Sequence, residues 1–130
     1  MAARGATYSF KIKSATLPVT GTWDGSGIAP DVYVNVLVNG TVQKSTTQKK
    51  TFSPSWNESL AVSIPDPTAT VQFCLWDYDS GLFDDPDQID CLSFTGDDLS
   101  RLLRDGFSGT RTSTTTVTFA VDVDRTGDLP

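Results

Sequence analysis

The sequence has no histidine, a single glutamate and no long apolar run, and these absences exclude several classes of function. Without histidine, the chain lacks the commonest general base and most zinc chemistry. No apolar stretch is long enough for a transmembrane helix, and residues 1–10 lack the apolar segment of a secretory signal peptide. The formal net charge of −6 argues against a nucleic acid partner. These features predict a cytoplasmic protein that does not bind nucleic acid.

The chain has 130 residues, which is enough for one domain with one core. We therefore expect a single domain over residues 1–130, with its core within about residues 7–124 and a loose tail over 125–130. Valine, threonine and serine are plentiful, apolar residues alternate along short runs, and turn signals recur between them. This pattern predicts an all-β fold, an antiparallel sandwich of seven to eight strands. The only helix expected is a short one near residues 98–104.

Aspartates gather in one short stretch, six of them between Asp77 and Asp90. They follow an alternating apolar run that predicts a half-buried strand, so they lie in a loop at a strand end. Like charges at this density repel one another unless a cation offsets them, and hard oxygen ligands suit calcium. Aspartates two apart on a strand end, such as Asp77 and Asp79, point the same way and can reach one ion. The stretch therefore predicts a calcium site.

Two further patterns bear on the compartment. Cys74 and Cys91 flank the acidic stretch, where a hairpin could place them opposite each other. Asn39-Gly-Thr and Asn57-Glu-Ser match the glycosylation pattern. One interpretation is two ordinary strand cysteines and two chance matches. The other is an extracellular domain excised from a longer protein. Sequence alone cannot give the geometry that a disulfide requires, so both remain open.

An ordered set of motifs resembles the C2 domain family over about Tyr8 to Leu103. Asp24 and Asp31 bracket a first loop, and Asp31-Val-Tyr-Val is similar to the family's Asp-Pro-Tyr-Val. Ser53-Pro-Ser-Trp-Asn-Glu resembles its Asn-Pro-x-Trp-Asn-Glu, and Asp77-Tyr-Asp resembles the Asp-x-Asp that opens its third loop. The sequence Trp-Asp-Tyr-Asp-Ser-Gly at residues 76–81 is also somewhat similar to that of the C2 domains of perforins. The chain departs from the pattern at Val32, at Asp90 and in a longer third loop.

The resemblance implies a C2-like β-sandwich that binds calcium between two loops. The ligands it implies are carboxylates from both loops: Asp24, Asp31, Asp77, Asp79 and either Asp85 or Asp87. Counting from the start of the third loop favours Asp85, whereas counting back from Ile89 favours Asp87. Five carboxylates could neutralise two calcium ions with a small negative remainder. The expected partner is an anionic phospholipid membrane, to which the domain binds peripherally when calcium is present.

Apolar and basic residues near these loops are candidates for membrane contact. Leu82, Phe83, Trp23 and Ile28 are expected at loop tips, where they could enter the membrane interface. Lys44, Lys49 and Lys50 could bind lipid headgroups, although a solvated strand face explains them as well. Trp56, Asn57 and Glu58 are expected to be structural.

The same residues bear on three other functions. One is a calcium-independent module that binds a protein partner through its sheet faces. Another is an extracellular membrane-targeting domain of a secreted or pore-forming protein. Catalysis finds no support, because a nucleophile has no base beside it and the carboxylates are too crowded to act as an acid–base pair. The sequence thus predicts a binding module and not an enzyme.

Overall fold

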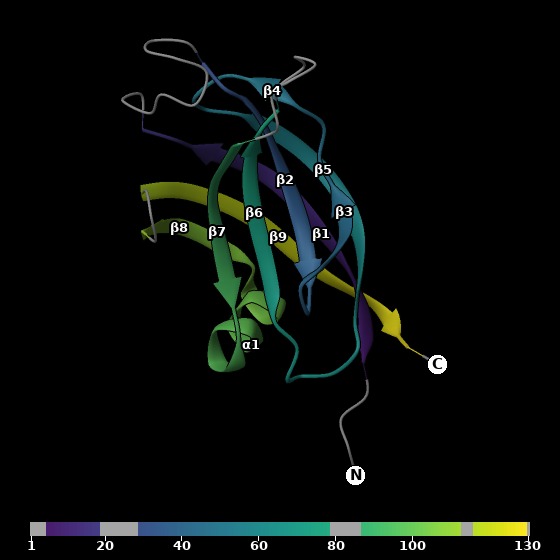
Figure 1. The fold of residues 1–130 in the computed structure, drawn as a ribbon. Helices are drawn as coiled ribbons and strands as arrows, with labels where there is room; N and C mark the ends of the chain where they lie inside the picture. The colour runs from purple at the N-terminus through teal and green to yellow at the C-terminus, as the bar shows by residue number, and fades with distance from the viewer. Residues whose placement is uncertain (1–4, 19–28, 79–86, 113–115, 130) are drawn as a thin grey trace.

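The computed structural model describes residues 5–18, 29–78, 87–112 and 116–129 (Figure 1). Its described part contains nine strands and one helix, in the chain order that follows. They are β1 (Ala6–Thr16), β2 (Asp31–Val38), β3 (Thr41–Ser45), β4 (Lys49–Lys50), β5 (Ser55–Ile64), β6 (Val71–Asp77), β7 (Asp87–Phe94), α1 (Gly96–Asp105), β8 (Phe107–Thr112) and β9 (Thr116–Asp128).

The strands form two antiparallel sheets. One sheet has the order β5-β1-β9-β8. The other has the order β3-β2-β6-β7, and the two-residue β4 also pairs with β2. In Figure 1, β2, β6 and β7 run side by side in front of β1 and β9, and α1 lies at the lower end of the molecule. The all-β sandwich with one short helix is therefore confirmed.

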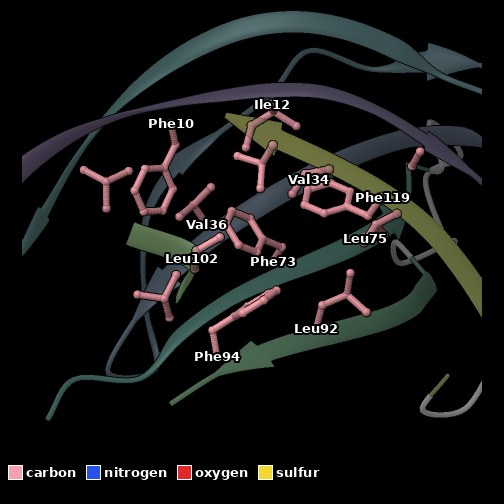
Figure 2. Packing of buried hydrophobic residues seen from close by; sticks show 14 of the residues in the cluster. Phe10, Ile12, Val34, Val36, Phe73, Leu75, Leu92, Phe94, Leu102 and Phe119 are labelled. Atoms are coloured by element: carbon pink, nitrogen blue, oxygen red, sulfur yellow. The ribbon is translucent and has the colours of Figure 1, made fainter. Parts of the chain in front are cut away.

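The core fills the space between the two sheets, and Phe73 on β6 lies at its centre (Figure 2). Its ring centroid lies 5.8 Å from that of Phe10, 5.6 Å from that of Phe94 and 5.1 Å from that of Phe119. These rings come from β1, β7 and β9, so one side chain of one sheet contacts both sheets. Buried aromatic groups of this size dominate the stability of a small core.

Element boundaries differ from expectation at the C-terminal end. The helix begins at Gly96 after Thr95 as its N-cap, and Asp97 and Asp98 lie in its first turn, where acidic side chains favour the helix dipole. The final strand, β9, begins at Thr116 and is the second strand of a hairpin whose first strand is β8. The sequence of β8 has almost no apolar alternation, which is why the pattern did not predict it.

The expectation of a loose tail over residues 125–130 is wrong for most of that segment. Strand β9 continues to Asp128, which pairs with Ala6 on β1. Leu129 also donates its backbone N–H to the carbonyl of Gly5 over 3.1 Å. Backbone pairing with β1 holds this segment, and such pairing leaves no apolar pattern for the sequence to reveal.

Candidate functional site

Three of the aspartates expected to bind calcium lie at adjacent strand ends. Asp31 is the first residue of β2, Asp77 the last of β6 and Asp87 the first of β7. Strand β6 lies between the other two, Asp77 pairing with Val32 on one side and with Asp87 on the other. All three ends meet at the upper end of the sheet in Figure 1. Residues far apart in the sequence therefore meet at one edge of the sandwich.

The side chain of Asp77 is held by the strand beside it. The backbone N–H of Asp31 donates to Asp77 Oδ1 over 2.9 Å, and the N–H of Tyr78 donates to the carbonyl of Asp31 over 2.9 Å. Asp77 is fully buried, whereas Asp31 is half-buried. A charged group buried to this degree is unfavourable without hydrogen bonds or a cation to compensate it. The arrangement fixes one carboxylate at the end of the core and leaves its neighbour partly open to solvent.

A second buried carboxylate belongs to Asp90, which the sequence shows only as a departure from the family pattern. It is 3% exposed and its Oδ1 accepts the backbone N–H of Cys91 over 2.8 Å. On the ladder it lies opposite Leu75, on the core face, diagonally across from Asp77. Strand parity could have found it, because Asp90 lies two residues before the buried Leu92.

The three candidate headgroup-binding lysines are all exposed but do not form one group. Lys50 pairs with Asp31, and Lys49 pairs with Val32, so both lie beside the aspartates at the strand ends. Lys44 pairs with Val36, halfway along β2. Only Lys49 and Lys50 are therefore placed to add positive charge at the candidate site.

Trp56 and Glu58 anchor the chain between β3 and β4 to strand β5. Trp56 is 7% exposed, and its Nε1–H donates to the carbonyl of Thr47 over 2.8 Å. Glu58 accepts the backbone N–H of Thr47 over 3.1 Å and also its hydroxyl. The Trp-Asn-Glu motif thus fixes the segment that leads to Lys49 and Lys50, in keeping with the structural role expected for it.

Tyr33 lies on β2, two residues after the candidate ligand Asp31. Burial of its hydroxyl, followed by the nearby Tyr78, raises the pKa of the phenol above its ordinary value. The phenol therefore stays protonated and uncharged at neutral pH, and it adds no negative charge to the acidic end of the sheet.

Several of the expected site residues lie outside the described residues. These are the candidate ligands Asp24, Asp79 and Asp85 and the candidate membrane contacts Trp23, Ile28, Leu82 and Phe83. Asp87 is described in its backbone alone. Within the described ranges, no group of three or more metal-ligating side chains comes together. The described part of the site is thus Asp31 and Asp77.

The donor chemistry of these two residues fits calcium. Both offer carboxylate oxygens, which hard divalent cations prefer, and neither has a sulfur or imidazole ligand beside it that would favour zinc. Asp77 places a carboxyl group in a buried position, where a bound cation would stabilise its charged form. Calcium needs about 6–8 oxygen ligands, so the remaining oxygens have to come from the aspartates outside the described residues, from water or from lipid.

The comparison with protein families is decisive for the fold. The model of the C2 domain matches residues 8–115. The chain belongs to the C2 domain family. C2 domains are in general calcium- and lipid-binding modules that bind membranes peripherally, and some bind proteins. The match covers all three strand ends described above and every motif on which the resemblance was based.

Solved C2 structures share this architecture. The C2A domain of a plant extended synaptotagmin 1 has a TM-score of 0.71 at 18% identity, covering 96% of this chain and 97% of that one. A calcium-bound structure of the C2A and C2B domains of extended synaptotagmin 2 also has a TM-score of 0.71 at 18% identity, covering 96% of this chain and 47% of that one. At this identity the likeness shows the fold alone.

Sequence relatives match shorter segments. Protein C2-DOMAIN ABA-RELATED 5 of Arabidopsis thaliana is 38% identical over 55 residues, which is 42% of this chain and 28% of that protein. Arrestin domain-containing protein B of Dictyostelium discoideum is 36% identical over 59 residues, 43% of this chain and 10% of that protein. The chain therefore matches less than a third of the length of either. Separately, the described part of the chain contains no helix long and apolar enough to cross a membrane.

Proposed function

We propose that this C2 domain is a calcium-dependent phospholipid-binding module with no catalytic role. The observation that carries the proposal is the meeting of Asp31 and Asp77 at one edge of the sandwich, joined by a hydrogen bond from one backbone to the other side chain. Asp24, Asp79 and Asp85 or Asp87 complete the ligand set of the proposal, which provides for two calcium ions. Bound calcium would neutralise these carboxylates and offer coordination positions to headgroup oxygens.

In this proposal the acidic, basic and apolar residues have different roles in membrane binding. Asp31 and Asp77 supply negative charge at the sandwich end, which repels an anionic surface as long as no cation is bound. Lys49 and Lys50, next to Asp31 on the adjacent strand, attract lipid phosphates once that charge is offset. Leu82, Phe83, Trp23 and Ile28 are proposed to enter the membrane interface. The net charge of −6 makes this dependence on a cation strong.

The proposal is tested by sedimentation with phosphatidylserine-containing vesicles, in millimolar calcium and again in chelator. Sedimentation with calcium alone is the expected result. Sedimentation in neither condition, together with no calcium-induced rise in melting temperature, would favour the calcium-independent protein-binding module instead. Sedimentation in both conditions would indicate that the lysines, and not bound calcium, attach the domain to the vesicles. Vesicles of phosphatidylcholine alone are the control for charge.

A further inference from the structure

The two cysteines of the chain are bonded to each other. Cys74 and Cys91 lie directly opposite each other on β6 and β7, with their Cα atoms 4.0 Å apart, and form a disulfide across a sequence separation of 17. Forming it transfers two electrons and two protons from the thiols to an acceptor disulfide of a thiol oxidoreductase, which an oxidising compartment supplies, whereas the cytosol keeps protein thiols reduced. Of the two compartments considered from the sequence, the disulfide therefore favours the extracellular one.

In an oxidising secretory compartment, the glycosylation patterns at Asn39 and Asn57 become candidate sites of N-glycosylation. Asn39 and Gly40 form the exposed two-residue turn between β2 and β3, with φ angles of 52° and 83°. A Cβ placed on Gly40 would meet no atom within 4 Å, so the space around the turn is open. Asn39 Oδ1 accepts the backbone N–H of Thr70 over 3.0 Å, while its Nδ2 has no partner in the described part of the chain.

The second candidate is placed differently, although it is exposed too. Asn57 lies within β5 between Trp56 and Glu58, the two residues that hold the β3–β4 connection. Its Nδ2 donates to Ser55 Oγ over 3.3 Å, so the atom that would carry a glycan already has a role in the fold. The structure thus separates two patterns that the sequence presents as equal.

We propose that Asn39 is an N-glycosylation site of a domain that matures in the oxidising secretory pathway. In this reaction Asn39 Nδ2 attacks the anomeric carbon of a lipid-pyrophosphate-linked oligosaccharide. The nitrogen–carbon bond forms, the bond from that carbon to the pyrophosphate oxygen breaks, and one amide proton leaves with no change of oxidation state. The hydroxyl of Thr41 completes the recognition pattern.

The turn lies at the far end of the sandwich from the candidate calcium site. Asn39 follows Asp31 by eight residues along β2, which corresponds to roughly 26 Å at about 3.3 Å per residue. A glycan there leaves the edge with Asp31 and Asp77 uncovered. The disulfide and the turn do not depend on whether the domain binds calcium.

The test is peptide mapping of the protein from its own source, treated with peptide N-glycanase in H₂¹⁸O. Trypsin cuts after Lys13 and Lys44 to isolate Asn39, and after Lys50 and Arg101 to isolate Asn57 with both cysteines. Asparagine followed by glycine deamidates spontaneously, so a sample without glycanase sets the background. We expect ¹⁸O-labelled aspartate at position 39 and cysteines that resist alkylation before reduction. An unlabelled Asn39, or label at Asn57 alone, would overturn the proposal.

A matched pair of variants of the full chain tests the same site in secreting eukaryotic cells. Thr41→Ser keeps the recognition pattern and Thr41→Val removes it, while neither changes the turn itself. We expect a glycanase-sensitive mass shift in the wild type and in Thr41→Ser and none in Thr41→Val. A shift that persists in Thr41→Val, or that is absent from the wild type, would contradict the assignment.

Discussion

The backbone N–H of Asp31 donates to Asp77 Oδ1 over 2.9 Å, and this bond joins the beginning of β2 to the end of β6. The two residues are 46 positions apart in the sequence, yet they lie on neighbouring strands of one sheet. The bond uses one carboxylate oxygen of a fully buried aspartate and orients the group at the sandwich end. The side chain of Asp77 therefore has a role both in packing and in the proposed calcium site.

Asp77→Asn is the variant that separates these two roles. The amide keeps an oxygen that can accept the N–H of Asp31, so the calcium-free melting temperature should stay close to that of the wild type. Losing the charge should abolish calcium-dependent sedimentation with vesicles and the calcium-induced rise in melting temperature. That rise corresponds to about 2.7 kcal/mol when calcium is at 100 times its Kd.

Asp66→Asn is the matched control, because Asp66 is a half-buried aspartate in the turn between β5 and β6. Hydrogen bonds from Thr68, first from its hydroxyl and then from its backbone N–H, lower the pKa of Asp66, so it is also charged at neutral pH. Removing this charge should leave vesicle binding unchanged. If both variants lost binding equally, general electrostatics rather than the proposed site would be responsible.

The sequence predicted the sandwich because its strands alternate. Val32, Val34 and Val36 are all fully buried on β2, as the period of two requires. The same rule does not predict β8 or the end of β9, because backbone pairing holds those segments in place with little apolar burial. Apolar patterning reveals strands that build the core, and it misses strands that only complete a sheet.

The candidate site was predictable in part for a related reason. Aspartates that gather in loops can be recognised from the sequence alone, so Asp31 and Asp77 were predictable as candidate ligands. Asp90 carries no loop or motif signal, and only the alternation of β7 places it on the core face, two residues before the buried Leu92. The pairing of the cysteines depends on a cross-strand register that local sequence does not fix.

The disulfide should stabilise the fold independently of calcium. It closes a loop of 17 residues, for which the chain-entropy model gives about 3 kcal/mol. The double variant Cys74→Ala, Cys91→Ala should lose stability by about this amount in urea unfolding. Reductant should destabilise the wild type similarly and leave the double variant unaffected. A wild type that is insensitive to complete reduction would contradict a stabilising role.

Trp56 and Glu58 should act as one unit, because both bond the same residue, Thr47. Trp56→Phe removes the indole N–H, and Glu58→Gln weakens the charged acceptor. Each change should cost about 1 kcal/mol in the free energy of unfolding. The double variant should cost less than the sum, because breaking either contact loosens the same segment. Strict additivity in urea unfolding would show that the two contacts are independent.

Phe83→Ala tests whether the acidic loop also contacts the membrane. Burying a phenylalanine side chain contributes at most about 1.5–3 kcal/mol, so vesicle affinity in calcium should fall by between about tenfold and a hundredfold. Calcium affinity in solution should stay nearly unchanged, because the phenyl ring supplies no oxygen ligand. Phe107→Leu provides a contrast, since Phe107 packs against Phe94 in the core and its loss should lower stability without a specific effect on vesicle binding. Isothermal titration with calcium and flotation with vesicles together separate the two effects. If Phe83→Ala weakened both affinities equally, the residue would support the calcium site and not the membrane contact.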